Sequence, residues 1–366
     1  MKTVVITDGK YRSAIAVARA LGRAGYRVVV TQTRADADIE PPVFSSRFAE
    51  GRWIEGGCGD PDYADRLLAL LAEFGRPVLL CVGAASLQVV SAQRERFSAA
   101  ADFLIAAPKT LALLNDKQAV HERAQALGLP VPEEFAGLPP RYPVVLKPHC
   151  GEALGLKAAQ RYAIAKNEAE YRAALAAMQR CDPQPIVQEY ISGDGRGVSV
   201  LMGKHSELLA AIGHRRIREY PYTGGPSTCC VTEYDEGRVT QAARLLQSVG
   251  FVGLAMVEFK GDRILEVNPR VWGTFPLTVF AGAGFCEAYA AAARGEAVEY
   301  APCNYPVGLK MRYLVNDLAA DFDLLRHGKP GACLSGLLDV FRVKEALYDP
   351  EDKAAYRSYL RSYFKR

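Results

Sequence analysis

The sequence predicts an α/β first lobe followed by an α+β second part. The first lobe is indicated by a strand-like run at 2–7, a helical pattern ending at Gly25 and a second strand-like run at 26–31. This order predicts parallel strands joined by a right-handed crossover. The second part is indicated by residues 143–268, where strands and helices come in blocks instead of alternating strictly.

Composition places the chain among globular proteins with a large core. Hydrophobic residues make up 49% of its 366 residues and charged residues 23%, which argues against a disordered or fibrous chain. The net charge of +4 is too small to indicate a nucleic-acid partner. Nine cysteines without C-x-x-C spacing disfavour a zinc site and a fully paired disulfide set. With no apolar run for a membrane span and no signal-peptide pattern, we expect a cytoplasmic protein.

Further elements follow from periodicity and from turn residues. Pro130 and Pro132 form a linker, where the residues alone place the first domain boundary. A hairpin at 253–268 turns at Gly261-Asp262. The other predicted helices lie at 61–74, 85–96, 108–128, 167–180, 235–249 and 275–294, and the other predicted strands at 77–82, 143–147, about 156–164, 185–190, 197–203, 207–216 and 306–314.

The sharpest chemical signal lies in the predicted hairpin. Glu258 is on its first strand, and Glu266 and Asn268 are two apart on the second, so the latter two share a face. Because Glu258 and Glu266 flank the turn almost symmetrically, we expect their carboxylates to meet. Two carboxylates and an amide oxygen suit Mg²⁺, and Arg270 adds a guanidinium for a phosphate or carboxylate. A solvated hairpin with ordinary polar residues is an equally weighted alternative.

Three further segments carry weaker signals. Lys147 ends an apolar strand before a turn that contains Gly151 and Gly155, an arrangement that can hold phosphates. Residues 186–193 (IVQEYISG) join a buried strand to a glycine turn, where backbone groups can contact an adenine edge. Lys117 precedes the linker and could reach between lobes. Taken singly, each segment is better explained as a solvated lysine or a plain strand and turn.

In combination, the order and spacing of these segments resemble the ATP-grasp superfamily. The resemblance covers about residues 1–295 and is nearest to uncharacterised ATP-dependent carboxylate–amine ligases, in a pattern shared with biotin carboxylase, carbamoyl-phosphate synthetase and D-alanine–D-alanine ligase. It implies a Rossmann-like N-terminal domain (1–107), an ATP-grasp domain (108–295) and a C-terminal extension (296–366). Within 108–295, it implies a nucleotide-binding part at about 130–205 and a metal and substrate part at about 206–295.

The resemblance also implies roles for single residues. Lys117 and Lys147 would contact phosphates, and Glu258, Glu266 and Asn268 would hold one or two Mg²⁺ ions, with Mn²⁺ as a substitute. Arg270 would steady the transferring phosphate. The adenine linker would be formed by Gln188, Glu189, Tyr190 and Ile191. At the ribose position the sequence departs from the pattern, since Gly195 stands where many members have an acid, and we substitute Asp194. His149 and Glu152 stand in a phosphate loop with fewer glycines than usual.

The segment 214–228 (HRRIREYPYTGGPST) is the predicted substrate loop. On a regular strand His214, Arg216 and Arg218 share one face and Arg215 opposes them. Arg218, with Arg216 or His214, would bind ATP phosphates or a substrate carboxylate. Gly224, Gly225 and Ser227 would follow in a loop that closes on the substrate. The alternative is a solvated basic strand.

The implied reaction joins a carboxylate to an amine, with ATP forming an acyl phosphate and ADP and phosphate leaving. It needs no nucleophilic cysteine, so Cys229 and Cys230 are read as structural. The alternatives are a carboxylation or carbamoyl-type transfer and a non-catalytic ATP-binding module. The expected partners are small-molecule carboxylate and amine substrates, without nucleic acid or membrane, and a homodimer is compatible. The helix at 353–366 has an apolar stripe that we expect to dock on its own protein.

Overall fold

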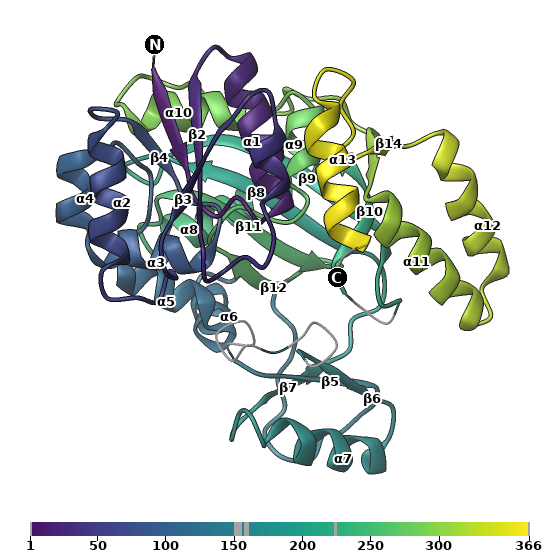
Figure 1. Ribbon diagram of the computed structural model, residues 1–366. Coiled ribbons are helices and arrows are strands. Elements are labelled where there is room, and N and C mark those ends of the chain that lie inside the picture. The colour runs from purple at the N-terminus through teal and green to yellow at the C-terminus, as the bar shows by residue number, and fades with distance from the viewer. Residues whose placement is uncertain (1, 150–155, 157–160, 223–224, 365–366) are drawn as a thin grey trace.

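The computed structural model describes residues 2–149, 156, 161–222 and 225–364, which form three sheets and the helices that cover them (Figure 1). One sheet has four strands, one has three and the largest has seven. The four-stranded sheet is parallel and the three-stranded sheet is antiparallel. The predicted combination of an α/β lobe with an α+β part is therefore confirmed.

The first lobe is a parallel sheet in the order β3-β2-β1-β4. Val4, Val5 and Ile6 are all fully buried, because helices cover both faces of the sheet. The strand β3 was not predicted, since its sequence EGRWI is half-exposed and charged. The elements of this lobe are β1 (Thr3–Ile6), α1 (Arg12–Arg23), β2 (Arg27–Thr33), η1 (Pro42–Ser45), β3 (Glu50–Ile54), α2 (Tyr63–Ala72), β4 (Val78–Leu80), α3 (Ala84–Ala92) and α4 (Arg94–Ala100).

The single helix predicted at 108–128 is two helices, α5 (Pro108–Asn115) and α6 (Lys117–Ala126). Asp116 separates them, because its side chain accepts hydrogen bonds from the backbone N–H groups of Gln118 and Ala119. An aspartate in this capping position favours a new helix start. Lys117 therefore lies at the first turn of α6.

A small antiparallel sheet of order β6-β5-β7 lies at one end of the molecule with α7 against it (Figure 1). Its elements are β5 (Val144–Lys147), β6 (Ala163–Ala165), α7 (Glu168–Met178) and β7 (Ile186–Glu189). Val144, Leu146 and Tyr171 belong to a core of its own, separate from the two larger hydrophobic clusters.

The seven-stranded sheet has the order β12-β11-β8-β9-β10-β13-β14. The strand β9 extends to Glu219, three residues beyond the predicted strand. The elements are β8 (Gly195–Met202), β9 (Leu208–Glu219), β10 (Ser227–Glu233), α8 (Glu236–Gln247), β11 (Gly253–Lys260), β12 (Arg263–Asn268), α9 (Phe275–Phe280), α10 (Phe285–Ala293), β13 (Lys310–Arg312) and β14 (Lys344–Glu345).

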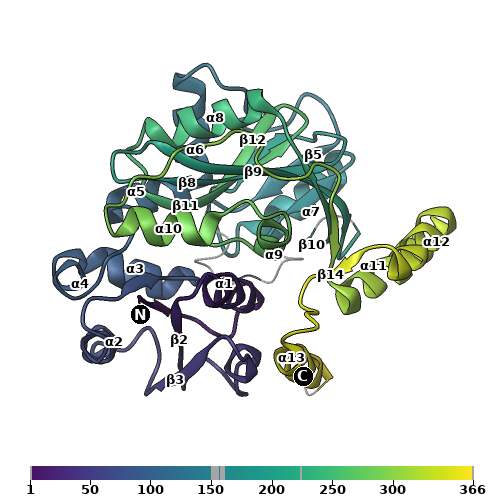
Figure 2. The same ribbon diagram turned by 90° about the horizontal axis from the view of Figure 1, so that it is seen from above.

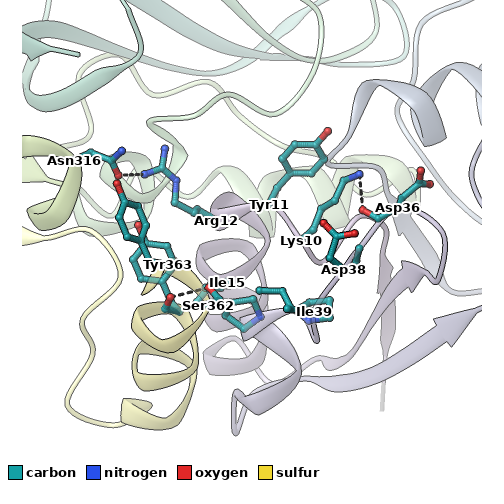
Figure 3. A pocket seen from close by; sticks show the side chains of 14 residues that line it. Lys10, Tyr11, Arg12, Ile15, Asp36, Asp38, Ile39, Asn316, Ser362 and Tyr363 are labelled. Carbon is teal, nitrogen blue, oxygen red and sulfur yellow. Dashed lines mark hydrogen bonds between the residues drawn. The ribbon is translucent and has the colours of Figure 1, made fainter. Parts of the chain in front are cut away.

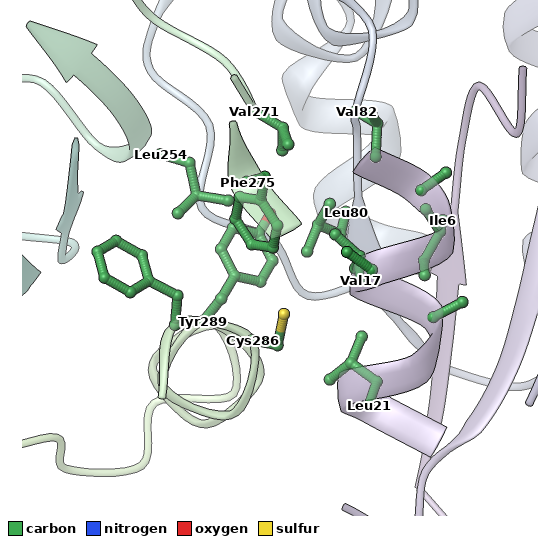
Figure 4. Close-up of a cluster of buried hydrophobic side chains, with 14 of the residues drawn as sticks. Ile6, Val17, Leu21, Leu80, Val82, Leu254, Val271, Phe275, Cys286 and Tyr289 are labelled. Carbon is green, nitrogen blue, oxygen red and sulfur yellow. The ribbon is translucent and has the colours of Figure 1, made fainter. Parts of the chain in front are cut away.

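A shared hydrophobic core joins the first lobe to the large sheet (Figure 4). Val17 and Leu21 of α1 face Phe275 of α9 and Tyr289 of α10. The Tyr289 hydroxyl also donates a hydrogen bond to the Leu79 carbonyl at 2.9 Å. Because these side chains are nearly all buried, the two parts are held together by hydrophobic burial and packing.

The C-terminal segment contributes α11 (Leu314–Arg326), α12 (Pro330–Leu338), η3 (Asp339–Phe341) and α13 (Lys353–Phe364). Figure 2 shows α11 and α12 extending away from the body, whereas α13 lies close to the first lobe. Tyr359 is buried in the shared core and Tyr356 and Leu360 pack against it, so the predicted docking of this helix on its own protein is confirmed. Within the described ranges, no helix has the length and apolarity needed to cross a membrane.

Candidate functional site

The two glutamates of the hairpin meet as expected. Glu258 of β11 and Glu266 of β12 are direct partners in the antiparallel register. The Asn268 side-chain amide donates to Glu258 Oε1 at 3.1 Å, so all three side chains gather on one face of the sheet. A bulge at Leu265 produces this register, because the pairs Lys260–Arg263 and Phe259–Ile264 beside the turn would otherwise place Glu258 opposite Leu265. Partner residues on neighbouring antiparallel strands share a face.

Three cations surround the glutamates. Lys117 Nζ lies 3.1 Å from Glu266 Oε2, and Arg216 Nη2 lies 2.5 Å from Glu258 Oε2. Lys147 Nζ donates to the carbonyl of Leu265 at 3.3 Å. The lysines thus come from α6 and β5, while the glutamates and the arginine come from the large sheet. Residues more than a hundred positions apart converge on one charged cluster.

The surroundings shift the pKa values of this cluster. Burial lowers the pKa of Lys147 to about 8, although Glu266 opposes the shift. Burial raises the pKa of Glu258 even though Arg216 favours its charged form. Burial would also raise the pKa of Glu266, but Lys117 and Lys147 together hold it below its usual value. The cluster therefore contains one carboxylate whose charged form is favoured, Glu266, beside one whose charged form is disfavoured by burial, Glu258.

The donor set formed by Glu258, Glu266 and Asn268 fits a hard divalent cation. Two carboxylates on adjacent strands and an amide oxygen are the ligands that Mg²⁺ prefers. No group of three or more His, Cys, Asp or Glu residues suited to a metal occurs in the described part of the chain. A cation at this position would be held by the two carboxylates together with the Asn268 amide oxygen.

The end of β7 offers both engaged and exposed groups. The Glu189 carboxylate accepts hydrogen bonds from the Glu133 N–H and from Arg263 Nε, both at 3.1 Å, so this side chain holds the strand to the linker and to β12. Gln188 is buried, and its Oε1 has no hydrogen-bond partner among the described residues. Tyr190 is exposed and Ile191 is half-buried, and the Tyr190 N–H donates to the carbonyl of Pro143 at 3.3 Å.

Arg270 follows the hairpin directly. Its backbone N–H donates to the carbonyl of Asn268 at 2.9 Å, and its Nη1 donates to the carbonyl of Val271 at 3.1 Å. The side chain is half-buried. Asp194, the substitute for a ribose-binding acid, is exposed and pairs with Arg215 at 3.0 Å.

The prediction that Arg216 and Arg218 share a face is wrong. Arg216 lies opposite Cys230, whereas Arg218 lies opposite the preceding residue, Cys229, because the register shifts between them. Consecutive residues of a strand point to opposite faces, so this bulge sends the two arginines to opposite sides of the sheet. Regular alternation, assumed from the sequence, fails at Ile217.

Arg218 is consequently engaged in a buried ion cluster. It is 8% exposed and binds Asp317 through two nitrogens, at 2.9 and 2.7 Å, and Asp339 at 2.9 Å. Asp321 lies 3.5 Å from its Nε. This geometry contradicts the expectation that Arg218 contacts ATP or a substrate. The sequence analysis did not single out these three acids, although Asp317 and Asp321 stand four apart in an apolar helix and so share its buried face.

His214 shares the face of Arg216 and is 3% exposed. Burial, together with the charge of Arg216, lowers the pKa of His214 to about 3, so the imidazole is neutral at pH 7. A Cβ at Gly197 would lie 2.3 Å from the His214 ring, so only glycine leaves room for the ring there. His214 Nε2 lies 3.4 Å from the Thr274 hydroxyl, and this contact links β9 to the segment after Arg270.

The remaining predicted residues lie within or beside the segments 150–155 and 223–224. Gly151, Glu152, Gly155 and Gly224 lie outside the described residues. Gly225 is half-buried, and Ser227 donates to the carbonyl of Cys229 at 3.1 Å. The backbone N–H of His149 donates to Asp182 Oδ2 at 2.9 Å, which fixes the chain just after Lys147.

Sequence reasoning also missed His121, which it treated as an ordinary residue. His121 is 1% exposed, with Nδ1 at 2.5 Å from Glu134 Oε1 and Nε2 at 3.0 Å from the Leu265 carbonyl. The same carbonyl accepts the Lys147 hydrogen bond. His121 therefore ties α6 and the linker to β12, and its pattern position on α6 carried no signal of this contact.

Comparison with known proteins shows which families and folds this chain is similar to. Residues 114–274 match the family model described as an ATP-grasp domain. The biotin carboxylase domain of 2-oxoglutarate carboxylase from Hydrogenobacter thermophilus superposes with a TM-score of 0.61 and 17% identity, over 84% of this chain and 73% of that one. Biotin carboxylase from Campylobacter jejuni gives 0.60 and 15%, over 84% and 74%.

A third solved structure, N5-carboxyaminoimidazole synthetase from Staphylococcus aureus, gives a TM-score of 0.59 and 16% identity, over 81% of this chain and 78% of that one. No curated protein matches the sequence. At these identities the structural similarities establish the fold, and the family-model match covers both lysines, the β7 exit, the acidic hairpin and Arg270. Residues 114–274 therefore match the ATP-grasp domain family, and most of the chain shares its fold with these solved structures.

Proposed function

We propose that this protein is an ATP- and Mg²⁺-dependent ligase that joins a carboxylate to an amine through an acyl phosphate and releases ADP and phosphate. The observation that carries the proposal is the cluster of Glu258 and Glu266 in register with three cations around them. A bare pair of facing carboxylates would repel each other. Cations from three other elements, together with a bound metal ion, would offset this repulsion.

The nucleotide is assigned to the space between β12 and the small sheet. Lys117 and Lys147 would contact its phosphates, since both ammonium groups already lie against β12. Backbone groups of Tyr190 or Ile191 would pair with adenine, supported by Gln188 and Glu189, and Asp194 would contact the ribose. The unpartnered Gln188 Oε1 supports this assignment, because a buried acceptor without a donor is costly unless a ligand supplies one.

Glu258, Glu266 and Asn268 would hold one or two Mg²⁺ ions, or Mn²⁺ in their place. When bound, the metal supplies charge neutralisation of the phosphate oxygens. Arg270 would then orient the transferring phosphoryl group, and Arg216 would bind either that group or the substrate carboxylate. His214 would lie beside the nucleotide phosphates. The loop that closes on the substrate would contain Gly224, Gly225 and Ser227. Arg218 takes no part, because its guanidinium is committed to buried aspartates.

Positioning supplies most of the chemistry in this scheme. Carboxylate oxygen leaves poorly, so phosphorylation must precede attack by the amine. The fixed guanidinium and ammonium groups stabilise charge that develops on the phosphoryl oxygens, and they are held in place before the reaction begins. The division into 1–107, 108–295 and 296–366, a cytoplasmic location and a homodimer remain part of the proposal.

A second function uses bicarbonate as the activated acid. It is favoured by the fold neighbours, which include biotin carboxylases and a carboxyaminoimidazole synthetase, one of them solved with bicarbonate. Both reactions activate a carboxylate by phosphorylation, so the same residues would serve either. The identity of the acid separates them.

The test is ADP release with pooled acids and amines, in buffer freed of bicarbonate and then with bicarbonate added back. Release that depends on an organic acid supports the ligase, and release that depends on bicarbonate supports the second function. With carboxyl-¹⁸O-labelled acid, label in inorganic phosphate is expected. Label in AMP would overturn the acyl-phosphate mechanism, and binding of ATP without release of any product would favour a non-catalytic module.

A further inference from the structure

A cavity of about 650 Å³ lies between the first lobe and the C-terminal helices. Its walls are the β1–α1 loop, the segment 36–42 after β2, Asn316 of α11 and the end of α13 (Figure 3). Small-molecule sites commonly have volumes of about 300–1,000 Å³. The lining residues differ from those proposed for the nucleotide and the metal, so a ligand in this cavity would be a different one.

The β1–α1 wall is held rigidly. Asp8 has a positive φ of 63°, which a non-glycine residue adopts only where its surroundings enforce it. Its carboxylate accepts hydrogen bonds from the Gly83 N–H at 2.9 Å and from the Ser86 hydroxyl at 2.5 Å. Its carbonyl accepts the N–H of Tyr11 at 3.1 Å. The turn that carries residues 10–12 is therefore held in one conformation before any ligand binds.

The α13 wall is fixed as well. Asp352, the residue before the helix, is 2% exposed. Its carboxylate accepts from Arg19 Nε at 2.8 Å, from the Ser46 hydroxyl at 2.7 Å and from the Arg47 N–H at 3.0 Å. These bonds attach the start of α13 to the first lobe. The cavity is thus preformed, which lowers the conformational entropy that the protein loses when a ligand binds.

Arg12 is the cation best placed to bind a ligand. Its guanidinium carbon lies 3.8 Å from the centre of the Tyr313 ring, and its Nη1 donates to Asn316 Oδ1 at 3.1 Å. A guanidinium has five N–H donors, and a stacked, oriented one is suited to bidentate contact with a carboxylate or phosphate. Ile15, Ile39 and the tyrosines of α13 supply an apolar and aromatic wall beside it.

The opposite side of the cavity carries acids instead. Figure 3 shows Asp36 and Asp38 beside Lys10, across from Arg12 and Asn316. The Asp36 carboxylate already accepts from the Thr33 hydroxyl at 2.7 Å and from the Cys58 N–H at 2.9 Å. An anionic group entering the cavity is consequently favoured at Arg12 and disfavoured near Asp38.

The Arg12 end is also the end connected to the proposed reaction centre. The Tyr313 hydroxyl donates to the carbonyl of Gly273, three residues after Arg270. We propose that the cavity binds a small organic acid, whose carboxylate pairs with Arg12 at the end nearer the segment 270–273 and whose apolar body lies against Ile15 and Ile39. This inference rests on the proposed function, since the bound acid would be one of the two substrates of the ligase.

The experiment is calorimetric titration of the full chain without nucleotide. The probe is 3-phenylpropionate, with 3-phenylpropan-1-ol as its neutral match and phenyl phosphate as the phosphoryl alternative. The variants are Arg12→Gln and Ile39→Trp, which fills the cavity from its surface loop. The control is Arg34→Gln, an exposed arginine of the same lobe that stacks on Trp53 at 4.4 Å outside the cavity.

We expect 3-phenylpropionate to bind the wild type and Arg34→Gln equally, and to bind Arg12→Gln and Ile39→Trp at least about tenfold more weakly, as loss of a charged hydrogen bond predicts. The alcohol should bind as weakly as the variants. Tighter binding of phenyl phosphate would overturn the carboxylate assignment, and unchanged binding to both variants would overturn the site. A separate titration with Mg-ATP distinguishes the two possible failures. If the chain binds Mg-ATP but not the acid, only this inference is wrong. If it binds the acid but not Mg-ATP, the proposed function is wrong.

Discussion

Arg216 and Arg218 are two residues apart on β9, yet they lie in two different kinds of charged cluster. Arg216 contacts Glu258 and Glu219, and the Glu258 and Glu266 side chains keep 15% and 30% of their surface exposed. Arg218 contacts Asp317 and Asp339 on the other face, where the Asp317 and Asp321 side chains are fully buried. Arginine–carboxylate pairs therefore differ in role between the two clusters, according to whether solvent reaches the carboxylates.

The difference indicates how to separate a ligand site from a structural ion pair. The Arg218 cluster is nearly closed: Asp317 is satisfied by Arg218, by Arg312 at 3.0 Å and by the Thr228 hydroxyl. The Glu258 and Glu266 cluster instead holds separate cations from three elements that can rearrange around an added ligand. Charges that remain accessible can exchange partners, whereas sealed charges stabilise one arrangement.

The largest effect is expected in the sealed cluster. Arg218→Met should lower the free energy of unfolding by about 3–5 kcal/mol, because it leaves buried aspartates without their partner. Urea denaturation measures the loss, and Arg215→Met, on an exposed pair with Asp194, is the control. If Arg218→Met kept wild-type stability and lost only activity, the arginine would be a ligand after all.

The next effect concerns the open cluster. Glu266→Gln should lower kcat by at least about 100-fold with little change in stability, because it removes a negative charge that faces the proposed metal. Steady-state ADP release and thermal unfolding measure the two quantities. The exposed Glu299 provides a control, Glu299→Gln. Wild-type kcat in Glu266→Gln would contradict the metal assignment.

A pH dependence distinguishes the clusters further. Burial, reinforced by Asp317 and Asp339 and opposed by Arg218 and Arg312, raises the pKa of Asp321 to about 6, whereas an unfolded aspartate has a pKa of about 3.9. The folded chain therefore holds a proton that the unfolded chain has lost, and the free energy of unfolding falls as the pH rises from about 4 to about 6.

Asp321→Asn removes this titration. At pH 7 the variant should be more stable than the wild type by about 1–3 kcal/mol, and below about pH 4 the difference should vanish. Denaturant titrations across this range measure it. A difference independent of pH would show that Asp321 does not carry the shift.

The smallest effect is expected at Arg270. Arg270→Lys should lower kcat about tenfold and change the Kd for Mg-ATP less, because a point charge does not replace the planar guanidinium in the transition state. Stopped-flow and equilibrium titration separate the two terms. An equal loss in both would indicate that Arg270 binds ground-state nucleotide.

The sequence predicted the hairpin and the meeting of its two glutamates, but it predicted the bulge of neither strand. Gly261 and Asp262 specify the turn, whereas a register shift between Glu258 and Phe259 brings Glu258 opposite Glu266 instead of Leu265. The bulge at Ile217 has no local signature, and a one-residue shift reverses every later side chain. The contacts of Lys117, Lys147 and His121 with β12 depend on how separate elements pack, which a linear pattern does not contain.

The most direct test of the account is calorimetric titration with a non-hydrolysable Mg-ATP analogue. The wild type should bind it, Glu266→Gln should lose the dependence of binding on Mg²⁺, and Arg218→Lys, measured where it is folded, should bind as the wild type does. Equal binding by wild type and Glu266→Gln with and without Mg²⁺, or loss of binding only in Arg218→Lys, would contradict the assignment of the open cluster as the nucleotide and metal site.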